Sequence, residues 1–478
     1  MADLANVLVV SDLHFGEELL PGASTERRRA VELAASAFRA FLAHHAARRL
    51  RGRPWRLVIA GDLFDFMSVV VPGTPALPAT SADERRLGLQ RGVAAGVVRM
   101  RMIAEAHRPL LTELVRFAAA GHQVDIVVGN HDVELLEPEV AAELAAHFRA
   151  AGADARALAR LRVVPWFVYI PGVAWIEHGH VYDEGCSFEF NLAPCDPADG
   201  RLVWNADYAA VRHLGTALPE VDPHAVEDWS FWGFLRFGWQ QGAGSFGRLL
   251  LGYVRFIGAM VDARALHRSH RRRDRRRREH RARLVRAAAE GGLSLERANA
   301  IDRLARTPLT VSWRRLGRMV MLDKLGLAAG VVLAWLLLAL LLPVAWALVG
   351  GAVTVAAAVG VSRWLGTHLV TSQLPMRAVP RRLRAHVDVP VIVFGHTHDP
   401  RWQPLDGGGL YVNCGTWLPA TRPGLRKSFT HVMIQLQAPG RAPKIELRQW
   451  RDGASSPFTV EPEAEHPIAM PDPVGVAS

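Results

Sequence analysis

Short runs of apolar, β-prone residues recur along the chain, with segments of helical spacing between several of them. Five runs are predicted as buried strands: 7–10, 57–60, 125–128, 173–176 and 391–394. Helical spacing occurs over 26–51, 84–119 and 138–160, whereas 67–82 is rich in Pro and Gly and is predicted as a loop. Strands that alternate with helices predict a layered α/β domain.

Each predicted strand is followed directly by side chains that can ligate metal ions. The segments are Asp12-Leu13-His14, Gly61-Asp62-Leu63-Phe64-Asp65, Gly129-Asn130-His131-Asp132, His178-Gly179-His180 and Gly395-His396-Thr397-His398. Ligands in open α/β proteins gather at the carboxyl ends of strands. We therefore expect residues separated by roughly 400 positions to meet in one site. Asp, Asn and His without Cys favour hard or borderline divalent metals.

The chemistry of this set suits a pair of divalent ions. Two such ions about 3.5–4 Å apart can clamp the attacking and leaving oxygens of a phosphoryl transfer. Two ligand carboxylates, one amide and four histidines leave the ions electrophilic. Asp62 is the candidate bridging ligand and Asn130 offers a carbonyl oxygen. His131, next in the chain, is expected to face the substrate.

In this order, and each after a strand, the five segments resemble the calcineurin-like metallophosphoesterase family. The resemblance covers residues 5–181 and about 388–436. It implies a four-layer β-sandwich flanked by helices, and phosphoester or pyrophosphate hydrolysis by a metal-activated hydroxide. Manganese is the expected metal, with iron or zinc as alternatives.

The resemblance also assigns a role to each position that matches a motif. The implied ligands of the first ion are Asp12, His14, Asp62 and His398. Those of the second ion are Asp62, Asn130, His178 and His396, with Asp62 shared. His131 matches the histidine that contacts phosphate and protonates the leaving oxygen, and Asp65 matches the carboxylate that orients it. His180 receives no role, and Asp132 is as compatible with a structural cap as with catalysis.

The residues around the motifs are similar to those of the UDP-2,3-diacylglucosamine pyrophosphatase-like branch of the family. The similar segments are 11–16, 61–66, 395–400 and 411–417. This chain differs from that branch in having His131 where the branch has Arg, and in carrying a long apolar insert. The resemblance implies a phosphate-containing, amphiphilic substrate that is lipid-linked or nucleotide-like. A nuclease of the same fold and a non-catalytic membrane anchor or assembly protein are the alternatives.

The two parts of the predicted core are separated by a long helical insert. We predict core segments at 1–181 and 386–451, the insert at 182–385, and a flexible tail at 452–478. The insert contains an aromatic stretch from Trp229 to Val261, an arginine run from His267 to Arg286, and an apolar run from Leu325 to Ser362. The aromatic stretch suits the headgroup zone of a membrane.

The apolar run contains no ionisable residue and is divided by Pro343. If His396 completes a site with Asp12, both ends of the run must lie on one side of a membrane, which favours a hairpin over a single crossing. Positive flanks favour the cytoplasmic side for both ends. These flanking residues are Arg314, Arg315, Arg318, Lys324 and Arg363. A soluble, buried hairpin is the alternative.

The formal net charge of +11 favours anionic partners. The arginine run has three possible interpretations: a juxtamembrane helix on anionic lipid, a patch that binds nucleic acid, or a solvated helix face. Three cysteines at irregular spacing form no zinc-finger or disulfide pattern. No signal peptide is recognised, so we expect a location at the cytoplasmic face of the cell membrane. The sequence does not set the oligomeric state.

Overall fold

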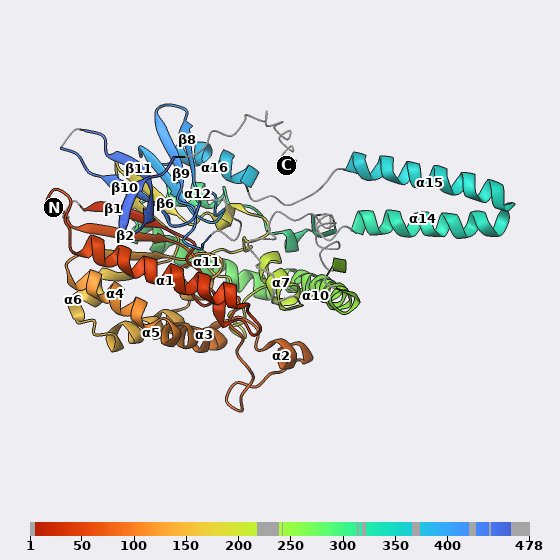
Figure 1. The fold of residues 1–478 in the computed structure, drawn as a ribbon, viewed down its shortest axis with the longest axis horizontal. Coiled ribbons are helices and arrows are strands. Elements are labelled where there is room, and N and C mark those ends of the chain that lie inside the picture. Colours follow the sequence, from red (N-terminus) through yellow and green to blue (C-terminus); the bar gives the residue numbers. More distant parts are fainter. Residues whose placement is uncertain are drawn as a thin grey trace.

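The computed structural model describes residues 5–217, 239–240, 242–312, 315–317, 322–365, 373–419, 427–438 and 441–459. Two multi-strand sheets pack face to face, and helices cover their outer faces (Figure 1). The predicted mixed α/β class is confirmed. A helical hairpin projects from one end of this body (Figure 1).

The larger sheet has seven strands in the order β12-β11-β10-β1-β2-β3-β4. Their bounds are β1 Asn6–Val10, β2 Trp55–Ala60, β3 Gln123–Val127, β4 Leu161–Val164, β10 Thr430–Gln435, β11 Lys444–Arg451 and β12 Ala454–Pro457. Strands β1 to β4 are parallel, and β10 pairs antiparallel with β1, with Leu8 opposite Met433. The predicted tail from 452 is therefore wrong at its start, because 454–457 form a strand of this sheet. Residues 460–478 of that tail lie outside the described residues.

The smaller sheet has five strands in the order β5-β6-β7-β9-β8. Their bounds are β5 Phe167–Ile170, β6 Ala174–Glu177, β7 Val391–Phe394, β8 Arg401–Leu405 and β9 Gly409–Asn413. Strands β6 and β7 are parallel neighbours, with Ile176 opposite Val393, although the whole insert separates them in the chain. All five strands predicted from the apolar runs are confirmed.

Alternation along the strands places one apolar face between the sheets and the other under helices. In β1, Val7 and Val9 pack in the core between the sheets, whereas Leu8 and Val10 pack under the helices. Both faces are apolar because both are covered, as expected of parallel strands inside a layered protein. The helices on the larger sheet are α1 Thr25–Ala46, α3 Val93–Ala106, α4 Arg108–Ala119 and α5 Pro138–Ala150.

Two predicted helices are each divided in the structure. The segment 84–119 forms α2 Ala82–Leu87, α3 and α4. Gly88 and Gly92, at φ values of 78° and 150°, separate α2 from α3, and His107 separates α3 from α4. The segment 138–160 forms α5 and α6 Ala155–Arg160, separated near Gly152 at φ 97°. The loop predicted at 67–82 contains no helix or strand until α2 begins.

The insert supplies the helices that cover the smaller sheet. Its α-helices are α7 Ala206–His213, α10 Ala243–Arg268, α11 His270–Glu290, α12 Leu295–Asp302, α14 Leu322–Leu341, α15 Val344–Leu365 and α16 Gln373–Arg384. Leu284 of α11, Ile301 of α12 and Leu383 of α16 pack with Trp175 and Phe394 of the sheet. Short 3-10 helices are η1 Glu17–Leu19, η2 Val133–Leu136, η3 His180–Tyr182, η4 Gly215–Ala217 and η5 Leu309–Val311.

The arginine run forms α11 and is not a uniformly solvated face. Arg276 is buried and, with Arg273, forms an ion pair with Glu189. Arg283 pairs with Glu137 at 3.1 Å. The pair with Glu137 attaches the insert to the core, and the pairs with Glu189 hold α11 to the first part of the insert. The opposite side of α11, which includes Arg271 and Arg275, is exposed.

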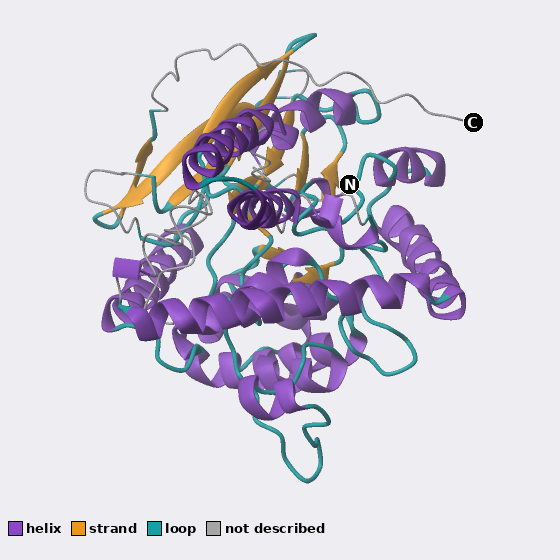
Figure 2. Ribbon diagram, turned by 90° about the vertical axis from the view of Figure 1, so that its right-hand side faces the viewer, coloured by secondary structure: helices purple, strands orange, loops and turns teal. Residues whose placement is uncertain are grey.

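The apolar run forms the antiparallel helices α14 and α15, joined at Pro343 (Figures 1 and 2). A Cβ at Gly351 would lie 2.5 Å from the Trp335 ring, so this glycine permits close contact between the two helices. The span Val344–Ser362 has a mean hydropathy of 2.1, and only 6% of it is buried. Gly326–Leu341 is a shorter apolar helix. The hairpin is thus an exposed apolar element.

Two expectations about the insert fall partly outside the described residues. These are the first part of the aromatic stretch, 229–238, and the flanking residues Arg314 and Arg318.

Candidate metal centre

The five predicted ligand segments converge at the carboxyl ends of β1, β2, β3, β6 and β7. All seven predicted metal ligands, together with His131 and Asp65, are linked by short contacts between their side chains or backbones. The contacts form two adjacent clusters, and Asp62 lies between them. Several of their atoms lie within 4.8 Å of one another, in groups that could hold a metal ion.

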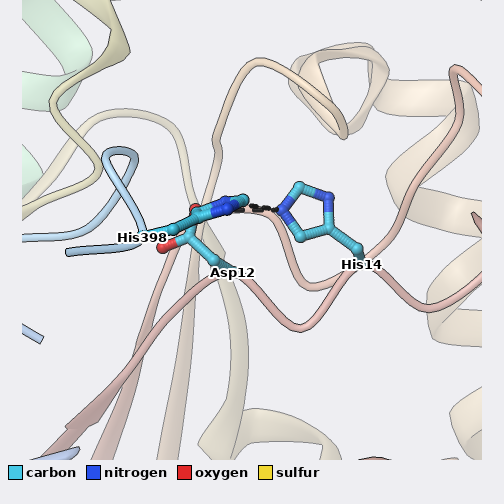
Figure 3. Close-up of side chains that lie close together, drawn as sticks. All are labelled: Asp12, His14 and His398. Atoms are coloured by element: carbon cyan, nitrogen blue, oxygen red, sulfur yellow. Dashed lines mark hydrogen bonds and ion pairs between the residues drawn. The ribbon is translucent and has the colours of Figure 1, made fainter. Parts of the chain in front are cut away.

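The first cluster contains Asp12, His14 and His398 (Figure 3). His14 Nε2 lies 3.1 Å from His398 Nε2, and His398 Nε2 lies 3.1 Å from Asp12 Oδ1. Neighbouring ligands on one octahedral ion, each about 2.1 Å from it, are separated by about 3.0 Å. Two of the three pairs have this spacing, and His14 Nε2 lies 3.9 Å from Asp12 Oδ1. In the sequence, His14 precedes the insert and His398 follows it.

The second cluster contains Asp62, Asn130 and His178. His178 Nε2 lies 3.1 Å from Asp62 Oδ2 and 3.0 Å from Asn130 Oδ1. His178 Nδ1 lies 2.8 Å from the carbonyl oxygen of Ala60, which can only accept, so Nδ1 is the donor. In the neutral imidazole, Nε2 then presents a lone pair to two further oxygen acceptors. Either a proton on Nε2 or a metal ion among these atoms would relieve the repulsion of their lone pairs.

The pKa values of Asp62 and His178 show that positive charge stabilises this cluster. Burial favours the neutral form of Asp62, but the charges of His178 and His131 outweigh it and hold the pKa of Asp62 well below its ordinary value. Burial disfavours charge on His178, yet Asp62 outweighs burial and raises the pKa of His178 to about 9. A divalent ion can supply this positive charge, with the imidazole binding in its neutral form.

Asp62 lies between the two clusters. Its Oδ2 is 3.1 Å from His178 Nε2 and 4.0 Å from His14 Nε2, while its Oδ1 accepts a hydrogen bond from the His131 backbone N–H at 2.9 Å. It is 1% exposed. This is the position that a bridging carboxylate needs.

His396 is held beside both clusters by acidic side chains. Its backbone N–H donates to Asp12 Oδ2 at 3.1 Å, and its ring centroid lies 5.2 Å from that of His178. His396 Nε2 lies 3.2 Å from Asp183 Oδ2. Its ligand atoms group with Asp183 and Cys186, and not with Asp62 and His178, so the structure places His396 beside the second cluster and not within it.

The backbone at the candidate ligands is strained. Among the described residues, eight non-glycine residues have positive φ, and five of them are candidate ligands. Their φ values lie between 51° and 70°, at Asp12, His14, Asp62, His396 and His398. Such conformations cost on the order of 1–3 kcal/mol each and cluster at functional sites. This observation is independent of the side-chain distances.

Glycines allow the strand ends to approach closely enough to form the clusters. A Cβ at Gly129 would lie 2.1 Å from Asp62 Oδ1, and one at Gly61 would lie 2.3 Å from the His178 ring. A Cβ at Gly395 would lie 2.5 Å from Ser11 Oγ and 2.7 Å from Asp12 Oδ2. Any side chain at these three positions would displace a candidate ligand or its hydrogen-bond partner.

His131 and Asp65 form a pair next to the first cluster. His131 Nδ1 lies 3.3 Å from Asp65 Oδ1, and the His131 ring centroid is 4.4 Å from that of His14. Asp65 is fixed by hydrogen bonds from the Met67 backbone N–H and from both the backbone N–H and the hydroxyl of Ser68. Burial opposes charge on His131, but Asp62 and Asp65 outweigh it and raise the pKa of His131 to about 10. The imidazole is therefore protonated at neutral pH.

Asp132 supports the backbone of the site. Its two carboxylate oxygens accept from the backbone N–H groups of Gly129, Leu63 and Phe64. Burial and the charge of Asp62 raise the pKa of Asp132 to about 7. These contacts give Asp132 the structural role that the sequence left open.

His180 is buried and neutral. Burial, with the nearby His178 and His396, holds the pKa of His180 well below its ordinary value. Its Nδ1 is buried without a hydrogen-bond partner among the described residues. His180 lines a small, mainly apolar pocket with Trp166 and Ile301.

Sequence reasoning missed three residues that position the site. Asp183 contacts His396, and Asp207 Oδ2 accepts from Asn130 Nδ2 at 2.9 Å. Arg91, buried in an ion pair with Glu134, donates to the backbone oxygen of His131 at 2.9 Å. Asp183 follows His178 closely in sequence and could have been suspected. Asp207 and Arg91 carry no motif that points to the site.

The residues present fit divalent cations. Carboxylate, amide and imidazole donors converge on two adjacent positions, and Asp12 Oδ1 is buried without accepting a hydrogen bond from the described part of the chain. The identity and number of the ions are not fixed by this arrangement. No protein-family model and no curated protein matches this chain.

Removal of the shared carboxylate should eliminate metal binding. We expect Asp62→Ala to lose all ions that the parent protein retains after dialysis, because both clusters lose the negative charge between them. Metal content measured by plasma mass spectrometry tests this expectation. Asp125→Asn is the matched control, since Asp125 is equally buried but pairs with Arg56 and Arg162 away from the site. An Asp62→Ala protein that keeps the parent's metal content would remove the bridging assignment.

Loss of the hydrogen bond to Asn130 should weaken binding without abolishing it. Asp207→Ala frees the amide to turn its nitrogen toward the metal position, and such losses typically cost about 10–100-fold in metal affinity. Asp207→Asn can still accept from Asn130 Nδ2 and should restore most of the affinity. Titration calorimetry with Mn²⁺ measures both variants. Equal affinities in Asp207→Ala and the parent would contradict this role.

Proposed function

We propose that this protein is a membrane-associated, metal-dependent phosphohydrolase of the calcineurin-like metallophosphoesterase type. The observation that carries the proposal is that His178 Nε2 lies 3.1 Å from Asp62 Oδ2 and 3.0 Å from Asn130 Oδ1. The adjacent cluster of Asp12, His14 and His398 offers a second ion position. Two sheets packed face to face with helices outside both are compatible with the four-layer sandwich of that family.

The residues of the two clusters would bind the metal ions, and His131 would transfer the proton. Divalent ions bound in the two clusters would polarise a phosphate group and lower the pKa of bound water. The ligand set carries two carboxylates and otherwise neutral donors, so positive charge remains to attract an anionic substrate. Manganese is our preferred metal, with iron and zinc as alternatives.

His131 has the properties of a general acid in this reaction. The charges of Asp62 and Asp65 raise its pKa, its Nδ1 faces Asp65, and it lies beside the first cluster. A proton delivered from its ring to the leaving oxygen would neutralise the charge that develops when the phosphorus–oxygen bond breaks. Asp65 would hold the ring in place and stabilise its cationic form.

The exposed apolar surface of the hairpin supports the proposal that the substrate is amphiphilic. A core helix of a soluble protein is mostly buried, whereas Val344–Ser362 is almost wholly exposed. Leu340, Val344 and Trp346 at the tip are 79%, 76% and 67% exposed. We infer that α14 and α15 enter the cytoplasmic face of the cell membrane, where a lipid-linked or nucleotide-type phosphoester would be concentrated near the enzyme.

Part of the arginine run is engaged within the protein. Arg273 and Arg276 pair with Glu189, and Arg283 pairs with Glu137, so these three guanidinium groups are not available for nucleic acid. The exposed Arg271 and Arg275 keep a nuclease as the alternative function. A non-catalytic anchor protein would have no need for the protonated His131–Asp65 pair.

His131→Ala should keep the metals and slow the reaction. The purified protein in detergent with Mn²⁺ should hydrolyse bis-p-nitrophenyl phosphate, and loss of the acid should lower kcat by about 10²–10⁴-fold. His147→Ala, on the outer helix α5, is the matched control. Parallel assays with nucleotide-diphospho-lipids, phospholipids and oligonucleotides identify the substrate class. Unchanged kcat in His131→Ala would refute its role, and absence of turnover in the parent would favour the anchor protein.

Extraction of membranes with alkaline carbonate tests the hairpin. We expect the full-length protein to stay in the membrane pellet, because α14 and α15 would have to expose their apolar surface to leave the bilayer. The protein content of pellet and supernatant gives the measurement. Release into the supernatant would favour the soluble hairpin.

A further inference from the structure

Helix α10 has two apolar faces, of which only one is covered. Phe256, Ala259 and Met260 are buried and belong to the small core that α10 forms with α7 and η5. The second face contains Leu250, Leu251, Val254 and Val261, which are 53%, 48%, 58% and 41% exposed. A helix on the surface of a soluble protein normally presents polar residues there.

Helix α10 lies at the same end of the body as the hairpin. Figure 1 places α10 beside the region from which α14 and α15 project, and Figure 2 views this end of the molecule. The hairpin is itself apolar and exposed, with Val332 and Leu333 both 58% exposed at the middle of α14. Two apolar surfaces without a protein partner among the described residues are therefore found at one end.

Charge and aromatic content indicate what covers α10. The helix contains Arg248, Arg255, Arg264 and Arg268 against a single acidic residue, Asp262. Trp239, which precedes it, is 73% exposed. The arginines would contact anionic headgroups and the tryptophan suits the interface, while the second apolar face of α10 is already covered by protein.

We propose that α10 is an interfacial helix whose Leu250, Leu251 and Val254 face rests among anionic lipid headgroups while the hairpin inserts beside it. The inference rests on the proposed membrane association and adds a second contact to it. A hairpin alone would let the body swivel on the membrane, whereas a second contact fixes its orientation.

The second contact also links the membrane to the metal centre. Ala209 of α7 and Met260 of α10 belong to the same core. On α7, Asp207 accepts the hydrogen bond from Asn130. One helix thus separates the proposed lipid contact from a candidate metal ligand, which suits a substrate whose phosphate lies at headgroup level.

Depth-dependent quenching tests the proposal on the full-length chain. An environment-sensitive fluorophore is attached to a cysteine in three variants: Val254→Cys on α10, Val332→Cys on the hairpin and Leu33→Cys on α1. Leu33 is the matched control because it is an exposed apolar residue, at 55%, on a helix of the body. The signal of the parent protein, which contains the partly exposed Cys186, is subtracted. The proteins are reconstituted in phosphatidylcholine vesicles containing phosphatidylglycerol and a spin-labelled lipid.

We expect a shallow spin label to quench the fluorophore at Val254 at least about twofold more than a deep one, since interfacial helices lie about 5–10 Å into the headgroup boundary. The deep label should quench the fluorophore at Val332, and neither should quench the one at Leu33. Vesicles without phosphatidylglycerol should reduce the quenching at Val254 several-fold.

Quenching at Val332 without quenching at Val254 would overturn the inference and leave the hairpin proposal intact. Absence of quenching at both would overturn both. A blue shift at Val254 without quenching would show that protein, either another segment or a second copy, covers this face, and would also overturn the inference.

Discussion

Two buried carboxylates in one small space are the constraint on which the site depends. Asp12 and Asp62 are 0% and 1% exposed, and groups of their atoms lie within 4.8 Å of one another and of His178. Two like charges cannot remain ionised together in a low-dielectric interior unless positive charge lies between them. In the metal-free protein, protonated histidines supply part of that charge. Divalent ions would supply it more completely and release the imidazoles to act as neutral ligands.

The rest of the site follows from bringing these groups so close. Carboxylates and imidazoles can converge only if their backbones leave the strands abruptly, which explains the left-handed conformations at Asp12, Asp62 and His396. Their cost, on the order of 1–3 kcal/mol each, must be offset by surrounding packing and by whatever binds there. The sheets provide that support, because residues such as Val9 and Val393 immediately before the turns are buried in the core between them.

The elements predicted best were those in which local pattern and local chemistry agree. Each apolar run ending in Asp, Asn or His marks both a strand and its polar end, so the five strands and the convergence of their tips could be predicted. Asp207 and Arg91 could not, because their roles depend on which distant backbone they meet. The break near Gly88 and Gly92 was not predicted, because the residues on both sides of these glycines have helical spacing. Ion pairs such as Arg276 with Glu189 likewise depend on tertiary placement, which a run of arginines does not reveal.

The position of the insert is compatible with assembly of the site. Strands β6 and β7 pair directly although roughly 200 residues separate them. Each doubling of a flexible connection costs only about 0.6 kcal/mol of closure entropy. This connection is also folded: α11, α12 and α16 cover the sheet that it interrupts. Because α14 and α15 run antiparallel, the chain enters and leaves the hairpin at the same end. His396 and His398 would therefore lie on the same side of a membrane as Asp12. A membrane hairpin can therefore be inserted into this fold without separating the two halves of its metal centre.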